Sequence, residues 1–447
     1  MLQRKATAPA RTITPNAAAA LVTSGMWLDY AAGLLQPDVF DAALAARRAD
    51  LTDVKIRTCL STRPRAVLEL DPEGAHFYAL SLHFSGYDRR QHDAGRMGYL
   101  PVNLGEIPDY YRRFIPPVDI LILKTCRMDE HGMFNFSALN LWHRAIVERA
   151  KCVIVEVTDG LPYVLGPDNG VHISEVDYII EGDNSPATEV PNPPASDVDR
   201  AVGRLISPEI EDGSCLQIGI GGMPNAVCTE LLHSSARDLG VHTEMMTDGI
   251  ADLYHAGRIT GVRKTLNPGR IVFSFALGSK KLYDTLHRNP DILACPVDYT
   301  NLPQNILQND RVVSINNTTQ IDLQGQAASE SDGFRHISGT GGQLQFVRGA
   351  YASKGGKSFI CLSSTYTKGG APRSRIVLSL TPGNIVTTPR TDVMYVVTEY
   401  GMVNLKGKSV AERAQALISI AHPDFREDLS RQAHDNRLIP RGFTFGP

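Results

Sequence analysis

The stretch CLQIGIGGMP, residues 215–224, joins an apolar strand to a glycine turn, and its proline lies where a helix would take its first turn. A second stretch, VHTEMMTDG at residues 241–249, has the pattern of a short strand that ends in an acidic residue, Glu244, before a turn. If both strands belong to one parallel sheet, their carboxyl ends open onto one crevice, where open α/β sheets bind ligands. The sequence therefore predicts that Glu244 faces whatever the glycine turn holds.

Apolar strand-like runs alternate with amphipathic helices along the rest of the chain. Val118–Lys124 and Lys151–Val157 are almost wholly apolar, as strands covered on both faces should be. Further strands are expected at Lys55–Ser61, His76–Phe84, 215–219, 241–244, Arg270–Phe275, Ile292–Ala294, Val312–Ile315, Phe359–Leu362, Ile376–Leu380 and Met394–Thr398. Helices are expected at 37–50, 106–114, 197–210 and 224–233, and a loop at 98–103. This alternation predicts an α/β fold with largely parallel sheets.

Residues 182–199, GDNSPATEVPNPPASDVD, contain four prolines and no apolar periodicity, which is typical of a linker. The strand and helix pattern starts again after this segment. We therefore expect two tandem open α/β domains, residues 1–195 and residues 196–447, with Glu244 in the second.

Composition and charge exclude several classes of protein. A net charge of −3 without a long basic run gives no reason to expect nucleic acid as a partner, and the apolar runs are too short to span a membrane. The seven cysteines are odd in number and never spaced as CxxC, so we interpret them as small buried hydrophobes in a reducing compartment. The first 28 residues are basic, as in a mitochondrial presequence, but lack the apolar core of a secretory signal. A helix and a strand are expected from Ala17 to Trp27, and we expect a cytoplasmic protein.

The glycine turn allows three interpretations. A strand, a G-x-G-x-x turn and a helix, with an acid at the end of the next strand, also begin a nicotinamide dinucleotide fold. Pro224 stands where that fingerprint has glycine or alanine, and the motif follows a whole α/β half. Binding of a phosphate or another group by backbone amides, binding of a dinucleotide and a plain tight turn all remain open from the motif. Glu244 is correspondingly either a solvated surface residue or a carboxylate nucleophile.

A second glycine-rich segment, SGTGGQLQF at residues 338–346, can bring backbone N–H donors close to a ligand or form a flexible loop. His131 has acidic neighbours, but no second histidine or cysteine stands at ligand spacing, so we expect no metal site. His242 is expected to shape the strand end and not to act as a base. The absence of G-x-S-x-G argues against a serine hydrolase.

Several segments together resemble the acetyl-CoA hydrolase/transferase family of class I coenzyme A transferases, close to the 4-hydroxybutyrate, butyrate and itaconate CoA-transferases. They are MDEHGMFNFS (128–137), GIGGMPNAV (219–227), LGVHTEMMTDG (239–249), PVDYTNLP (296–303), SINNTTQIDLQGQAASE (314–330), SGTGGQLQFVRGAY (338–351), VVTEYGMVNLKGKS (396–409) and IAHPDFREDL (420–429). Their order over nearly the whole chain makes the resemblance far more specific than any single motif. It implies a tandem α/β architecture, in agreement with the pattern of strands and helices.

The resemblance also implies residue roles. Glu244 would be the nucleophile, and Ile220 would supply one oxyanion amide within a coenzyme-binding turn. Gly341 or Gly342 would supply the second amide. Coenzyme contacts would come from Gly219, Ile220, Gly221, Gly222, Met223, Asn301, Asn316, Gly341, Gly342 and Gln343. Gln345 departs from the aspartate that many relatives have two positions after the glutamine of that loop.

The implied activity is a CoA-transferase that works through a glutamyl-CoA thioester in ping-pong fashion. It would move coenzyme A from a small acyl-CoA (acetyl-, butyryl- or succinyl-CoA) to a carboxylate such as 4-hydroxybutyrate or itaconate. Coenzyme A would be a substrate, with no tightly bound cofactor and no metal. Alternatives are an acyl-CoA hydrolase on the same fold and a nicotinamide-dependent oxidoreductase. A homo-oligomer, dimeric or higher, is expected because dimers are the commonest soluble assembly.

Overall fold

The computed structural model describes residues 4–190, 194–219, 221–440 and 442. Contacts within the chain define two compact units. Unit 1 comprises Met1–Pro191 and Val272–Thr300, and unit 2 comprises Asn192–Ile271 and Asn301–Pro447. The expected division near residue 195 treats both halves as continuous, whereas the segment 272–300 packs with the first unit.

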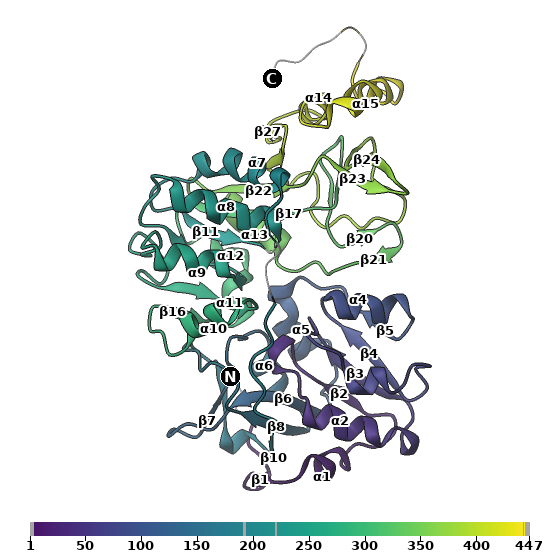
Figure 1. Cartoon of the computed structure of the whole chain (residues 1–447), viewed down its shortest axis with the longest axis vertical. Helices are drawn as coiled ribbons and strands as arrows, with labels where there is room; N and C mark the ends of the chain where they lie inside the picture. The colour runs from purple at the N-terminus through teal and green to yellow at the C-terminus, as the bar shows by residue number, and fades with distance from the viewer. Residues whose placement is uncertain (1–3, 191–193, 220, 441, 443–447) are drawn as a thin grey trace. The chain divides into compact units, whose positions relative to one another are not determined.

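Unit 1 contains an eight-stranded sheet in the order β1-β10-β8-β6-β2-β3-β4-β5, in which every neighbouring pair is parallel (Figure 1). Its strands are β1 (Arg11–Thr12), β2 (Trp27–Asp29), β3 (Val54–Thr58), β4 (Phe77–Ser81), β5 (Met97–Tyr99), β6 (Ile120–Cys126), β8 (Cys152–Thr158) and β10 (Tyr178–Glu181). All seven residues of β6 are buried, which confirms a strand covered on both faces. From β2 the chain adds β3, β4 and β5 on one side and later β6, β8 and β10 on the other. The topological switch point of this sheet therefore lies between β2 and β6.

The remaining elements of unit 1 are short. Its helices are α1 (Pro15–Ala19), α2 (Val39–Ala46), α3 (Ala66–Glu69), α4 (Gly86–Asp93), α5 (Ile107–Arg113), α6 (His143–Val147) and α10 (Lys280–Leu286). Its other strands are the antiparallel pair β7 (Met133–Asn135) and β9 (Gly170–His172), then β15 (Phe275–Ala276) and β16 (Ile292–Ala294). Two elements contain residues of both units, because the chain passes from one unit to the other within them: β14 (Ile271–Phe273) and α11 (Val297–Asn301).

Unit 2 contains a six-stranded sheet in the order β12-β11-β17-β22-β26-β27, in which only the last pair is antiparallel. The strands are β11 (Cys215–Ile218), β12 (Gly240–Val241), β17 (Val312–Asn317), β22 (Lys357–Cys361), β26 (Tyr395–Thr398) and β27 (Gly401–Asn404). From β11 the chain moves first to β12 on one side and then to β17 and β22 on the other. The switch point of this sheet lies between β11 and β17, and ligand crevices of open α/β sheets form at such points.

Helices and small hairpins complete unit 2 (Figure 1). The helices are α7 (Asp197–Ile206), α8 (Gly222–His233), α9 (Asp248–His255), α12 (Pro303–Ile306), α13 (Gln343–Ala352), α14 (Val410–Ser419) and α15 (Pro423–Asp435). The short strands are β13 (Met245–Met246), β18 (Gln320–Asp322), β19 (Ala327–Ala328), β20 (Ser331–Asp332), β21 (Arg335–His336), β23 (Thr365–Lys368), β24 (Ala371–Ser374) and β25 (Ile376–Val377). In α13, the helix that follows the second glycine-rich segment, Phe346, Val347 and Ala350 are buried.

Three local predictions need correction. Helix α8 begins at Gly222, two residues earlier than expected, although Pro224 does lie in its first turn. The strand expected at 241–244 ends at Val241, and Glu244 occupies a bend before β13. The loop expected at 98–103 begins as an edge strand, because β5 pairs with β4 over Met97–Tyr99. No helix in the described ranges is long and apolar enough to cross a membrane.

Candidate functional site

The glycine turn after β11 leaves no room for side chains. Gly221 has a φ of +122°, and a Cβ there would lie 2.8 Å from Asn317 Nδ2. A Cβ on Gly222 would lie 2.4 Å from Asp199 Oδ2. Gly219 continues the sheet by donating its N–H to Ile315 O at 2.9 Å. The turn thus places backbone without side chains at the switch point of the second sheet. A site that binds a ligand through backbone N–H groups requires such a close approach.

Of two further predicted turn residues, the structure describes Met223 but not Ile220. Met223 lies in the first turn of α8 and is buried. Ile220, the predicted source of an oxyanion amide, lies outside the described residues.

Asn316 lies beside this turn, in a buried polar network across the switch point. Its amide donates to Gln217 Oε1 (3.0 Å) and to Ser314 Oγ (2.9 Å), and its carbonyl accepts from Gln217 Nε2 (3.2 Å). Ser314 donates to Gln217 Oε1 at 2.6 Å. The network fixes the ends of β11 and β17 against each other. Gln217 and Ser314 were not predicted as site residues. A glutamine within an otherwise apolar strand is the sequence signal that points to such a network.

Glu244, Asn301 and Gly342 meet in unit 2. Asn301, fully buried, donates its side-chain amide to Glu244 Oε2 at 2.5 Å. The backbone N–H of Gly342 also donates to the Glu244 carboxylate. A Cβ on residue 342 would lie 2.2 Å from Glu244 Oε2 and 2.3 Å from Asn301 Nδ2. Glycine is therefore required at residue 342 by the close approach of these two side chains.

The environment of Glu244 favours the neutral acid more than water does. Burial raises the pKa of Glu244 to about 7, although the hydrogen bonds from Asn301 and Gly342 partly oppose the rise. The carboxylate also lies at the amino end of α13, whose first N–H groups have no partner within the helix. A half-buried carboxyl group with a pKa near neutrality is common where a side chain takes part in chemistry.

The second glycine-rich segment orients this contact. Gly341 has a φ of +58°, which favours glycine, and the turn it makes precedes Gly342 directly. Gln343 begins α13, and its side chain donates to Thr388 Oγ1 at 3.0 Å. Its side-chain amide is thus tied to the fold and is not directed at Glu244. Within the described part of the chain, no hydrogen bond joins the first glycine turn directly to Glu244.

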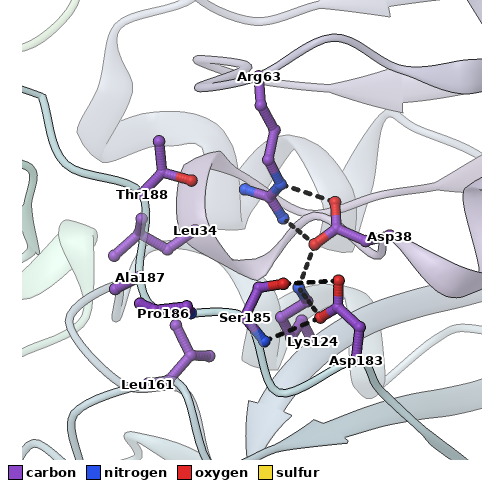
Figure 2. A pocket seen from close by; sticks show the side chains of 10 residues that line it. All are labelled: Leu34, Asp38, Arg63, Lys124, Leu161, Asp183, Ser185, Pro186, Ala187 and Thr188. Carbon is purple, nitrogen blue, oxygen red and sulfur yellow. Dashed lines mark hydrogen bonds and ion pairs between the residues drawn. The ribbon is translucent and has the colours of Figure 1, made fainter.

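Unit 1 has a cavity of about 260 Å³ (Figure 2). It is lined by Leu34, Asp38, Arg63, Lys124, Leu161, Asp183, Ser185, Pro186, Ala187 and Thr188. Because Leu34 follows β2 and Lys124 belongs to β6, the cavity lies at the switch point of the first sheet.

The charges around this cavity neutralise one another. Asp38 lies between Arg63 and the ammonium group of Lys124 (Figure 2). Arg63 Nε is 2.6 Å from Asp38 Oδ1. Burial opposes ionisation of Asp38, but the hydrogen bond and charge of Arg63 hold its pKa well below the ordinary value. Glu156 caps α2 by accepting the N–H groups of Asp38 (2.9 Å) and Phe40 (3.1 Å). These interactions order the loops of unit 1 and leave little uncompensated charge for a ligand.

Residues 2–191 match the model of the acetyl-CoA hydrolase/transferase N-terminal domain, and residues 278–433 match that of the C-terminal domain of the same family. The butyryl-CoA:acetate CoA-transferase of Anaerostipes caccae is 47% identical over 431 residues, which cover 96% of this chain and 97% of that protein. The 4-hydroxybutyrate coenzyme A transferase of Clostridium kluyveri is 44% identical over 357 residues, covering 80% and 82%.

Solved structures give the same result. RipA from Yersinia pestis superposes with a TM-score of 0.88 at 38% identity and covers 96% of this chain and 98% of its own. These similarities support a CoA-transferase and not a nicotinamide-dependent oxidoreductase. The protein is a CoA-transferase, and its chain belongs to the acetyl-CoA hydrolase/transferase family.

Proposed function

We propose that this enzyme transfers coenzyme A from a small acyl-CoA to a free carboxylate through a thioester on Glu244. One observation carries the proposal above the others. A carboxylate with a pKa near 7 is held by the amide of Asn301 against a backbone position, Gly342, where no side chain fits. Such an arrangement keeps one carboxylate oxygen fixed and brings an N–H donor to the place where an oxyanion would form.

The proposed reaction consists of two mirrored half-reactions. The Glu244 carboxylate attacks the thioester carbonyl, the C–S bond breaks, and an acyl-glutamyl anhydride and a CoA thiolate result. The thiolate attacks the glutamyl carbonyl carbon, and the bond between that carbon and the bridging oxygen breaks. The donor acid leaves as a carboxylate that keeps this oxygen, and the glutamyl-CoA thioester remains. A second carboxylate then reverses both steps. Each tetrahedral intermediate carries an oxyanion, and losing one donor to such an oxyanion costs about 3–4 kcal/mol in other enzymes.

We infer further roles around Glu244 from this geometry and from the family resemblance. The Gly342 N–H supplies one oxyanion donor, with Gly341 setting its direction. The turn at residues 219–223 contacts the coenzyme, through backbone amides other than that of Gly219, which donates to Ile315 O. The role of Ile220 as the second donor rests on the family resemblance. Asn316 fixes the ends of β11 and β17 beside this turn. We propose that residues 196–447 form the domain that carries the nucleophile, apart from the segment 272–300, which packs with unit 1, and that residues 1–195 form the other domain. We propose no tightly bound cofactor, because both half-reactions use only the carboxylate, the thiolate and backbone donors.

The substrates follow from the relatives at the level of class. The names of the two relatives above specify butyryl-CoA with acetate and 4-hydroxybutyrate, so short acyl chains and small carboxylates are the first choice here. Itaconate rests on the sequence resemblance alone. All seven cysteines are free and six are buried, which supports a cytoplasmic location. Assembly as a homo-oligomer stays a prediction.

Acceptor dependence separates transfer from hydrolysis. We expect consumption of butyryl-CoA to require added acetate and to yield acetyl-CoA in equal amount, with parallel lines in double-reciprocal plots as in ping-pong kinetics. Initial rates can be followed by chromatography of both thioesters. Release of free coenzyme A at the same rate with and without acetate would instead assign the enzyme as an acyl-CoA hydrolase, because water would then be the acceptor.

The pH dependence follows from the pKa of Glu244. Only the ionised carboxylate can attack, so kcat/KM should fall as the pH decreases through about 7, the pKa to which burial raises this group. Rates measured from about pH 5 to about pH 9 at constant ionic strength test this expectation. A kcat/KM that stays constant down to about pH 5, as expected for a glutamate with the ordinary pKa of about 4.3, would show that the nucleophile is not desolvated in the free enzyme.

A further inference from the structure

The glycine-rich loop before α13 is tied to one buried carboxylate. Glu330, only 3% exposed, accepts a hydrogen bond from the Thr340 hydroxyl at Oε2 (3.1 Å) and from the Thr387 hydroxyl at Oε1 (2.9 Å). Its backbone carbonyl accepts the N–H groups of Ile337 (2.9 Å) and Ser338 (3.3 Å). One residue therefore holds the loop through both its main chain and its side chain.

The segments around Glu330 are themselves held in place by hydrogen bonds. The N–H groups of Thr387 and Thr388 both donate to the carbonyl of Ala327, at 2.9 Å and 3.1 Å. The Thr388 hydroxyl accepts a hydrogen bond from the side-chain amide of Gln343, the first residue of α13. Both ends of the glycine-rich loop are thus attached to the paired segments 327–330 and 387–388. Buried polar networks in which the partners are satisfied restrict the conformations available to the backbone.

We propose that Glu330 is a positioning residue that, through Thr340, orients the Gly342 N–H toward Glu244. The inference rests on the proposed role of Glu244 as the nucleophile. Thr340 is two residues from Gly342, and the intervening Gly341 has a φ of +58°, so its rotation is not restrained by a side chain. The hydrogen bond from Thr340 to Glu330 fixes the loop on the amino-terminal side of Gly342, and the hydrogen bond from Gln343 to Thr388 fixes it on the other side. Loss of the Thr340 hydrogen bond therefore weakens one of the two restraints on the direction of the Gly342 N–H.

Loss of the tether, the hydrogen bond from Thr340 to Glu330, should affect the positioning of the Gly342 N–H more than the overall stability of the fold. A misplacement of about 1 Å in an active site can cost about 10²-fold in rate, even when the fold is intact. The Gly342 N–H also stabilises the charged form of Glu244. Loss of the tether should therefore change two separate properties, the rate of the covalent step and the pH at which Glu244 ionises.

Thr340→Val tests the tether with almost no change in side-chain volume. We expect kcat to fall about 10-fold or more while KM for the acyl-CoA changes less than about threefold, because orientation and not binding is lost. The acidic limb of kcat/KM should move to higher pH. Thr340→Ser, which keeps the hydroxyl, should restore both properties. The matched control is Thr398→Val, which removes the buried hydrogen bond from Thr398 Oγ1 to Ile420 O (2.6 Å) elsewhere in unit 2.

Two outcomes would overturn the inference. The first is a Thr340→Val enzyme that loses thermal stability but keeps the kcat and the acidic limb of the parent. The second is a Thr398→Val enzyme that shifts the limb equally. Borohydride trapping of the thioester in the parent is measured alongside. If Glu244 is labelled in the parent and labelled equally fast in Thr340→Val, the positioning role fails while the proposed function stands. If the parent is not labelled, the proposed function fails.

Discussion

Replacing Glu244 is expected to have the largest effect of any single change in the chain. Glu244→Ala removes the proposed nucleophile, and loss of a nucleophile costs roughly 10⁴–10⁶-fold in kcat in other covalent enzymes. Glu244→Asp keeps the charge but draws the carboxylate back by about 1.5 Å, the length of one C–C bond, so a loss of at least about 10²-fold is expected. Butyryl-CoA:acetate exchange, followed by chromatography, measures both variants.

Stability provides the control for this loss. Burial raises the pKa of Glu244 to about 7 in the folded protein, above the ordinary value, so the native state binds the proton more tightly than the unfolded chain. The stability that the protonated group contributes is fully present below about pH 4.3 and is lost as the pH rises through about 7, by at most about 4 kcal/mol. Glu244→Ala should melt at the same or a higher temperature than the parent at pH 8.

Glu209→Ala serves as a matched substitution, because Glu209 is another half-buried glutamate of unit 2, paired with Lys357 at 2.9 Å. We expect it to retain full exchange activity. Full activity in Glu244→Ala, or a comparable loss in Glu209→Ala, would contradict the assignment of Glu244 as the nucleophile.

Gly342→Ala is expected to reduce kcat by about 10²–10³-fold while leaving the enzyme folded. The added Cβ would lie 2.2 Å from Glu244 Oε2 and 2.3 Å from Asn301 Nδ2, so these atoms must move. Both atoms are at the ends of flexible side chains, and the fold can relieve the clash by turning them away. That movement displaces the proposed nucleophile from its N–H donor. Steady-state kinetics with a thermal melt of each variant measures both effects.

Two other glycines supply contrasting controls for this substitution. A Cβ on Gly349, in the same helix α13, would lie 2.5 Å from Ile306 Cγ2, so Gly349→Ala should lower the melting temperature with little change in kcat. Gly86→Ala meets nothing within 4 Å and should change neither property. If Gly342→Ala instead lost stability like Gly349→Ala and kept its kcat, the contact with Glu244 would have no part in the reaction.

Local sequence patterns were sufficient to predict the main strands of both sheets. The apolar runs at Val118–Lys124 and Lys151–Val157 become β6 and β8, because only strands buried on both faces tolerate so little polarity. The turn between β11 and α8 was equally visible from its glycines and from Pro224. Helix α13 was missed because the three glycines before it, at positions where a helix is disfavoured, obscured the apolar spacing that follows.

Contacts between distant residues could not be read from local patterns. Asn301 and Glu244 are 57 residues apart, and their contact depends on how the chain returns to the second sheet after β16. The same applies to the segment 272–300, which packs with the first unit although it follows strands of the second. Glu156 is a further example, since a glutamate in an apolar strand gives no indication that it caps α2. Only the resemblance over the whole chain pointed to Asn301.

Trapping of the thioester with borohydride shows directly whether Glu244 carries the covalent intermediate. The enzyme is incubated with butyryl-CoA, treated with borohydride and analysed by intact-protein and peptide mass spectrometry. We expect the Glu244 thioester to be reduced to an alcohol on that side chain, and the mass change to be absent in Glu244→Ala and Glu244→Asp. Turnover of butyryl-CoA by an enzyme that remains unmodified, or modification mapped to another residue, would contradict the covalent route through Glu244.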